Sequence, residues 1–398
     1  MMAPMEPVVP PASGPGRAYL DHAATTPMHP EAVEAMLPYL TGVFGNPSGG
    51  HLESRRARRA VDDARQHLAA SFGADLGDVV FTSGGTESDN LAVVGGWECR
   101  AGRARPPALV CAAMEHHAVL ATCRALARRT GAELREVGTG KDGLVDLDAL
   151  ATACTPDVGL VSVMAVNNEI GTVQPIEAVA ALVRAGAPNA LFHTDAVQAV
   201  PWMETAPLTA RADLVSISAH KFGGPKGVGA LVVGPGVGLR PLLHGGGQER
   251  ERRSGTHNVA GIVALSAALA VTESSRPATV ARVSALRDRL GDGILASVAG
   301  TVETGERAHR VAGSLHLRFA GVEAEALVIL LDRAGLAVSA GAACSSGAVE
   351  VSHVLTSMGL PPDEAASGIR MSLGATTTDA EVDQALAVVP GAVGQLRD

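Results

Sequence analysis

The sequence predicts an α/β protein with a large domain built on a mostly parallel sheet flanked by helices, followed by a smaller α+β domain. Short apolar runs alternate with helical stretches through most of the 398 residues. Most of these runs end in polar or ionisable side chains, as expected where the carboxyl ends of parallel strands meet at one crevice. From about Ser266 a long helical stretch is followed by alternating helices and short strands. We therefore expect a disordered leader (1–17), a segment that packs with the small domain (18–29), a large domain (30–265) and a small domain (266–398).

Composition and charge limit the classes of protein to consider. The net charge of −9 argues against a nucleic-acid-binding surface, and the arginines of residues 55–59 have Asp62 and Asp63 as helical ion-pair partners. The five cysteines contain no C-x-x-C pair, which suits a reducing compartment. The leader lacks the features of a signal peptide, and the apolar residues 261–271 are fewer than the roughly 20 that span a bilayer. We expect a cytoplasmic protein with no membrane span, no direct nucleic-acid binding and no metal.

The first elements predict a phosphate-binding turn. Residues 30–40 and 52–72 have helical spacing, and residues 79–82 form an apolar strand followed by Gly84 and Gly85. The helix that follows begins with Thr86-x-x-Asp89, which resembles a capping box. A strand, a glycine pair and a helix N-terminus together offer free N–H groups and a positive dipole end to a phosphate. The turn matches neither a Walker loop nor a G-x-G-x-x-G motif, so nucleotide binding is not indicated.

Five further apolar runs are predicted to be strands: residues 109–113, 159–166, 191–193, 213–215 and 229–233. The first four lead into candidate site residues. His116 follows the first run, Asn168 the second, Asp195 the third and Lys221 the fourth. These side chains are therefore expected to converge at one edge of the sheet.

Lysine is rare in this chain. Of its 32 lysines and arginines only Lys141, Lys221 and Lys226 are lysines, and the first and last of these lie in turn signals. Lys221 stands at a strand end beside Ser218 and His220, where it can be partly desolvated. A lysine of lowered pKa can form a Schiff base, whereas arginine cannot. Lys221 is thus a candidate to hold pyridoxal phosphate, and a solvated turn lysine is the alternative from this stretch alone.

Pyridoxal phosphate also needs an acid for its ring nitrogen, a group over its ring and a cradle for its phosphate. Asp195 is the candidate acid, and Gln198, one helical turn later, can donate to the ring hydroxyl. His116 can stack on the ring and move protons. The candidate phosphate ligands are Gly85, Thr86, Ser218 and His220. Each residue alone also has an ordinary structural explanation, such as a helix cap, but the set on successive strand ends favours a cofactor site.

The motifs together resemble a known family. In chain order they are LDHAATTP (20–27), GNPS (45–48), TSGGTESDN (82–90), EHHAVL (115–120), VNNEIG (166–171), DAVQ (195–198), SAHKFGGPKG (218–227) and RSGT (253–256). They resemble the NifS/IscS-type cysteine desulfurases of the class V aminotransferase-like branch, and the likeness covers nearly the whole chain after the leader. It implies a pyridoxal-phosphate-dependent transferase of type I fold, with a sheet of the seven-stranded kind.

The resemblance also implies residue roles. Lys221 would bind the cofactor as a Schiff base, Asp195 would pair with the ring nitrogen, and His116 would stack on the ring. Asn168 and Gln198 would contact the region of the cofactor hydroxyl. The implied phosphate ligands are Thr86, Ser218 and His220 of one subunit and Thr256 of the other subunit of a homodimer. Arg370, in GIRMSLG (368–374), would clamp the substrate carboxylate beside Asn168.

One late segment indicates the reaction. Residues 340–347, AGAACSSG, are small residues around Cys344, which reads either as an ordinary turn or as a loop with an exposed thiol. The spacing from Cys344 to Arg370 resembles that of the long-loop group of the family. In the family, the corresponding cysteine carries the persulfide. The implied function is conversion of L-cysteine to L-alanine, with sulfur passed to Cys344 and then to an acceptor protein. The alternatives are a selenocysteine lyase or another class V enzyme that acts on a different amino acid.

The resemblance does not select the sulfur acceptor. Iron–sulfur cluster, thionucleoside and DNA phosphorothioate synthesis all fit the family. The chain ends at Asp398, without the C-terminal extension expected of members that dock an iron–sulfur scaffold. The acceptor therefore stays open at the level of the sequence.

Overall fold

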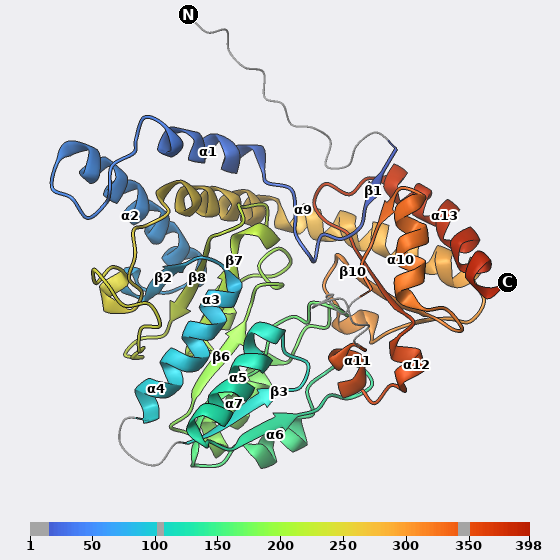
Figure 1. The fold of residues 1–398 in the computed structure, drawn as a ribbon, viewed down its shortest axis with the longest axis horizontal. Helices are drawn as coiled ribbons and strands as arrows, with labels where there is room; N and C mark the ends of the chain where they lie inside the picture. The colour runs from blue at the N-terminus through green and yellow to red at the C-terminus, as the bar shows by residue number, and fades with distance from the viewer. Residues whose placement is uncertain (1–15, 102–106, 341–350) are drawn as a thin grey trace, which may run out of the picture.

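The computed structural model describes residues 16–101, 107–340 and 351–398. Figure 1 shows a large part around a central sheet and a smaller part beside it, with the long helix α9 running through both. The sheet has seven strands in the order β2-β8-β7-β6-β5-β3-β4. They are β2 (Val79–Thr82), β3 (Ala108–Ala112), β4 (Leu134–Val137), β5 (Val158–Ser162), β6 (Leu191–Asp195), β7 (Leu214–Ser218) and β8 (Gly229–Val233).

The large sheet confirms the predicted fold class. Strand β8 is antiparallel to β2 and β7, and all the other neighbouring strands pair in parallel. Every residue of β5, β6, β7 and β8 is buried, because helices cover both faces of the sheet. Apolar strands of this kind are typical of parallel sheets.

The helices of the large part are α1 (Pro30–Leu40), α2 (Leu52–Phe72), α3 (Gly85–Asn90), α4 (Gly96–Ala101), α5 (His117–Thr130), α6 (Leu147–Ala153), α7 (Ile176–Gly186) and α8 (Ala206–Thr209), with short helical turns η1 (Leu76–Asp78), η2 (Leu91–Gly95), η3 (Ala219–Lys221) and η4 (Glu249–Glu251). The predicted bounds of α1 and α2 are confirmed. The predicted capping box of α3 is wrong, because this helix begins after Gly84 and has no side-chain cap. Glu87 instead accepts a hydrogen bond from the Ser83 amide.

The smaller part contains short strands and helices, as predicted. Strands β9 (Thr301–Glu303), β10 (Ser314–Phe319) and β12 (Gly368–Ser372) form an antiparallel sheet, and β1 (Ala18–Tyr19) pairs in parallel with β11 (Leu336–Ala337). The remaining helices are the turn η5 (Arg307–His309), α10 (Ala324–Arg333), α11 (His353–Ser357), α12 (Pro362–Ala365) and α13 (Asp379–Arg397).

Helix α9 (Val259–Ser297) connects the two parts and is longer at both ends than predicted. By length and composition it is the one helix among the described residues that could cross a membrane. However, its Leu265 and Leu269 belong to the core of the large part, and its Leu286 and Leu290 to the core of the small part. We therefore propose that the domain division falls within this helix. Leu20 packs in the second core, which supports the assignment of residues 18–29 to the small domain.

Candidate active site

Lys221 lies in η3, at the carboxyl end of β7, beside a cleft of about 810 Å³ between the two parts. Its Nζ donates hydrogen bonds to the carbonyl oxygens of Ala23 (2.6 Å) and Ala24 (2.9 Å). Burial, and then the charge of Arg370, lowers the pKa of Lys221 to about 8. A larger fraction of this amine is therefore neutral near physiological pH than of an ordinary lysine, which favours Schiff-base formation.

Asp195 ends the neighbouring strand β6 and is only 4% exposed. Its Oδ1 accepts a hydrogen bond of 2.8 Å from the Val197 amide. Burial raises the pKa of Asp195 to about 6, while the charge of Lys221 acts in the opposite direction. The carboxyl is thus ionised near neutral pH with few partners in the chain, which suits a group that pairs with a cationic ring nitrogen.

His116 caps the N-terminus of α5, where its Nδ1 accepts a hydrogen bond of 3.1 Å from the Ala118 amide. Burial, and then the charge of Lys221, lowers the pKa of His116 to about 4, so the ring is neutral. Because Nδ1 is the acceptor, the ring hydrogen belongs on Nε2, which is a donor in this orientation. The neutral ring can stack on an aromatic cofactor without repelling a charged Lys221.

The predicted phosphate cradle is a place where side chains are excluded. Gly84 has φ +148°, and a Cβ added at Gly85 would lie 2.9 Å from Val197 Cγ2 and 3.4 Å from Ser218 Cβ. The glycine pair therefore brings the backbone amides close to Ser218, which is buried, whereas Thr86 at the start of α3 is exposed. His220 lies nearby in η3, and its Nδ1 is 3.2 Å from Thr25 Oγ1.

Arg370, on β12, links the small domain to the large one. Its Nη1 donates to the Asn168 carbonyl (2.9 Å), and its Nη2 donates to Asp21 Oδ1 (2.8 Å). Its Nε and the side-chain oxygen Oδ1 of Asn168 are buried, and neither has a hydrogen-bond partner within residues 16–101, 107–340 and 351–398. Unpartnered polar atoms at a cleft fit a ligand that supplies the missing partners. Gln198 also reaches this edge, and its Nε2 donates to the Ala23 carbonyl (2.9 Å).

Sequence reasoning missed three contributors to this site. Asp21 pairs with Arg370, and the carbonyls of Ala23 and Ala24 hold the Lys221 amine. The signal was the motif of residues 20–27, whose likeness to the family was noted but not assigned a role. Proximity to a strand end cannot reveal it, because this segment comes from the far end of the chain.

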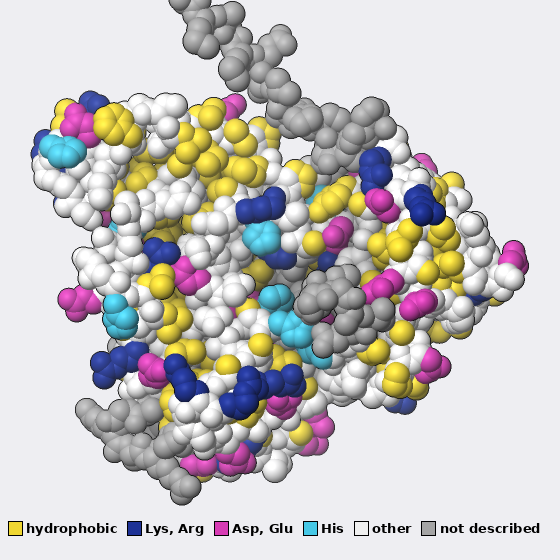
Figure 2. Space-filling model, in the orientation of Figure 1, with side chains coloured by type: hydrophobic (Ala, Val, Ile, Leu, Met, Phe, Trp, Pro, Cys, Tyr) yellow, Lys and Arg dark blue, Asp and Glu magenta, His cyan; other side chains and the backbone are white. Residues whose placement is uncertain are grey.

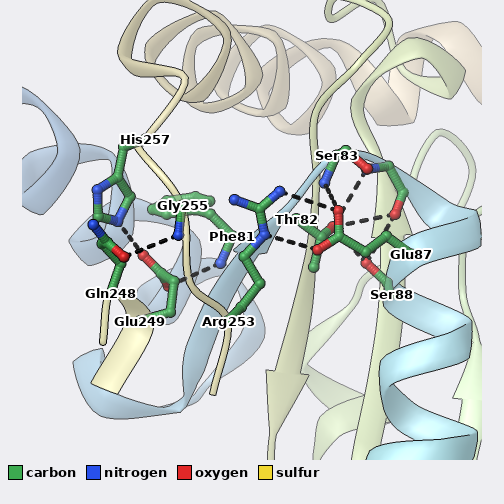
Figure 3. A network of polar contacts seen from close by, with 11 residues as sticks. Phe81, Thr82, Ser83, Glu87, Ser88, Gln248, Glu249, Arg253, Gly255 and His257 are labelled. Carbon is green, nitrogen blue, oxygen red and sulfur yellow. Dashed lines mark hydrogen bonds and ion pairs between the residues drawn. The ribbon is translucent and has the colours of Figure 1, made fainter. Parts of the chain in front are cut away.

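Two predicted site residues stand apart. Cys344 lies outside the described residues. Thr256 is exposed. It lies in a segment whose neighbouring residues Arg253, Gly255 and His257 make the polar contacts shown in Figure 3. There Arg253 Nε donates to Glu87 Oε1 (2.8 Å), and Glu87 Oε2 accepts from the Ser83 amide of the predicted phosphate turn (2.8 Å). Sequence reasoning did not anticipate this connection.

The site fits pyridoxal phosphate. The site combines a partly neutral lysine amine, a buried acid with spare acceptor capacity, a neutral histidine and a glycine-lined turn. These groups follow strands β7, β6, β3 and β2 of the same sheet. In the described parts of the chain, no group of three or more His, Cys, Asp or Glu side chains could hold a metal ion.

Known proteins resemble this chain over nearly its full length. The sequence model of the family described as aminotransferase class-V matches residues 18–385. A cysteine desulfurase of Cereibacter sphaeroides is 46% identical over 386 residues, which cover 96% of this chain and 97% of that protein. A solved NifS-like protein has a TM-score of 0.89 at 33% identity, covering 95% of this chain and 100% of that one. The crystal structure of DndA from Streptomyces lividans has a TM-score of 0.75 at 36% identity, covering 89% and 99%.

Proposed function

This chain belongs to the class-V aminotransferase family and to the cysteine desulfurases within it, and we propose that Lys221, Asp195, His116 and Cys344 carry its reaction. The enzyme uses pyridoxal phosphate, which acts when bound as an electron sink for the α-carbon of the amino acid. The observation that carries the residue assignment is the partly buried Lys221 amine, whose charge acts on the pKa of both Asp195 and His116.

Some residues of the cleft bind the substrate, and others transfer protons. Asn168 and Arg370 hold the substrate, whose carboxylate completes the coordination of the guanidinium already bonded to Asp21. Lys221 would take the α proton of the substrate, with an amine whose pKa of about 8 suits a base near neutrality. With the cofactor bound, Asp195 would pair with its ring nitrogen, and neutral His116 would offer a donor at Nε2 beside its ring.

Cys344 receives the sulfur. Its thiolate attacks the sulfur atom of the substrate cysteine, so that an S–S bond forms as the Cβ–S bond of the substrate breaks. The electron pair of that bond remains with the substrate carbon, which takes up a proton on the way to L-alanine. Only the thiolate form of Cys344 is a competent nucleophile.

The test is a Cys344→Ser variant with Cys99→Ser as its matched control, because Cys99 is an exposed cysteine outside the cleft. We expect Cys344→Ser to keep the visible absorbance of the bound cofactor and its change on adding L-cysteine, but to lose the extra sulfur seen by mass spectrometry. Cys99→Ser should behave like the wild type. Alanine production by Cys344→Ser at a near wild-type rate would remove Cys344 from the mechanism.

We propose further that the enzyme works as a homodimer in which Thr256 reaches the phosphate site of the other subunit. Two features support this. Thr256 is exposed, and apolar side chains gather on the outer face around α1 (Figure 2). The exposed members are Val33 (39%), Leu37 (53%), Leu40 (58%), Phe44 (76%) and Leu52 (49%). Sedimentation should report a dimer, and a monomer that retains full activity would contradict it.

The sulfur acceptor is proposed to be a protein, in a cytoplasmic setting. The described cysteines are all unpaired, which agrees with a reducing compartment. Incubation of the persulfide-bearing enzyme with candidate acceptors, followed by mass spectrometry of each acceptor, tests this assignment. It also separates iron–sulfur, thionucleoside and phosphorothioate pathways.

A further inference from the structure

A row of buried polar side chains crosses the large sheet beneath the candidate site. It consists of Glu115, Ser162 on β5, His193 on β6, Ser216 on β7 and Asp89 on α3, each no more than 1% exposed. His193 stands two residues before Asp195, and Ser216 two residues before Ser218. Because side chains alternate between faces along a strand, the row lies on the same face as Asp195 and Ser218, one step deeper.

The row is continuous. Ser162 Oγ lies 3.1 Å from Glu115 Oε1 and 2.9 Å from His193 Nδ1. On the other side of the ring, His193 Nε2 lies 3.0 Å from Ser216 Oγ and 3.6 Å from Asp89 Oδ1. Three hydrogen bonds thus connect Glu115, Ser162, His193 and Ser216, and Asp89 approaches the same imidazole at 3.6 Å.

The row contains no Lys or Arg side chain. Its imidazole is neutral as well, because burial lowers the pKa of His193 to about 3. An ionised carboxyl at either end of the row would therefore have no cation within the row to balance it.

The surroundings disfavour charge at both ends. Burial, and then the neighbouring charge of Asp195, raises the pKa of Asp89 and of Glu115 well above the usual range of carboxyls. Cys123, on α5, faces both groups and acts in the same direction. Among the described residues, Glu115 Oε2 and Asp89 Oδ1 accept no hydrogen bond, so an ionised form of either would be left incompletely bonded.

We propose that this row is a positioning network for Asp195. It keeps Glu115 and Asp89 uncharged at neutral pH and so reserves the buried negative charge for Asp195, which faces the cofactor ring nitrogen. The inference rests on the proposed role of Asp195. It adds that two acids which never touch the cofactor decide whether Asp195 can stay ionised.

The first test uses cofactor-free protein and infrared spectroscopy. At pH 8 the wild type should show the C=O absorption of protonated carboxylic acids, because Asp195 itself is ionised there. Asp89→Asn and Glu115→Gln should each lose part of that signal, and the double variant should lose it all. A wild type without the signal at pH 8 overturns the proposal, and this measurement requires no variant to fold.

The second test measures cofactor affinity by titrating the apo-protein with pyridoxal phosphate. The double variant should bind within about twofold of the wild type, because the amides can supply the same hydrogens. A large loss would mean that charged carboxylates are needed, which contradicts the proposal. Asp195→Asn is the control. If it binds the cofactor as tightly as the wild type, the proposed role of Asp195 is wrong. If only the infrared signal is missing, the positioning network is wrong but the proposed function stands.

Discussion

Asp195 and Glu249 are both buried carboxyls of the large domain, yet their surroundings differ sharply. Burial raises the pKa of Asp195 to about 6, and the Val197 amide is its hydrogen-bond donor. Burial acts on Glu249 too, but hydrogen bonds from His257 and then Arg65 outweigh it and lower its pKa to about 2. The two pKa values differ because the chain supplies different hydrogen-bond partners to the two carboxyls, and not because one carboxyl is more deeply buried.

Glu249 is held from several sides (Figure 3). Its oxygens accept from Arg65 (2.7 and 2.8 Å), from the Phe81 amide (2.9 Å) and from His257 Nε2 (2.5 Å). Glu249, Arg250 and Glu251 all lie in the left-handed region of backbone conformation, at φ 48°, 57° and 65°. A fully bonded carboxylate of this kind serves the fold, whereas one with spare acceptor capacity at a cleft can serve a ligand.

The largest effect is expected from Asp195→Asn. This change removes the negative charge proposed to pair with the cofactor ring nitrogen, so turnover should fall by about 100-fold or more while the protein still folds. Steady-state alanine production and circular dichroism measure the two effects. Retained activity would show that Asp195 is no more specialised than Glu249.

Glu249→Gln should lower the stability of the protein and leave cofactor binding intact, the opposite of what is expected for Asp195→Asn. Removing one partner of a buried ion pair leaves Arg65 uncompensated, so the free energy of unfolding should fall by about 3 kcal/mol. Urea unfolding of the apo-protein measures this loss, and the folded variant should still show the visible absorbance of the bound cofactor. An unchanged urea midpoint would contradict the role assigned to this network.

The pH dependence of stability should separate the two carboxyls. The pKa of Glu249 falls from 4.5 to about 2 on folding, so its stabilisation is present above pH 4.5 and is lost as the pH drops toward 2. The pKa of Asp195 rises from 3.8 to about 6, so its contribution is lost as the pH rises through 6. Each amounts to about 3 kcal/mol at most. Thermal unfolding of the apo-protein from pH 2 to 7 should show the first change disappear in Glu249→Gln and the second in Asp195→Asn.

Lys221 should react at lower pH than an ordinary lysine. Its pKa of about 8, against the usual 10.5, predicts that reductive methylation of the apo-protein reaches half of its maximal rate near pH 8 at this residue. The chain has only two other lysines, Lys141 and Lys226, and both serve as internal references in the same digest. Equal labelling of the three across the pH range would mean that Lys221 is not perturbed.

The smallest effect is expected from Glu87→Gln. Glu87 and Arg253 are partly buried, at 15% and 20% side-chain exposure, and join the phosphate turn to the segment that carries Thr256. Weakening this ion pair should lower cofactor affinity by a few-fold, equivalent to about 1 kcal/mol. Equilibrium titration with pyridoxal phosphate measures the loss, and Glu98→Gln, which disrupts an exposed pair with Arg129, is the control.

The sequence by itself determined the fold class and the bounds of α1 and α2, because these depend on local periodicity. It also predicted candidate site residues at the strand ends, from where each strand stops. It pointed to Lys221 through the rarity of lysine. Only the tertiary structure decided that Asp21 pairs with Arg370, 349 residues away, and that Glu87 fastens the segment of Arg253. It also decided that one buried carboxyl is left with spare acceptor capacity and another is fully bonded. These outcomes depend on which side chains distant segments bring together, and no local pattern in the chain encodes that.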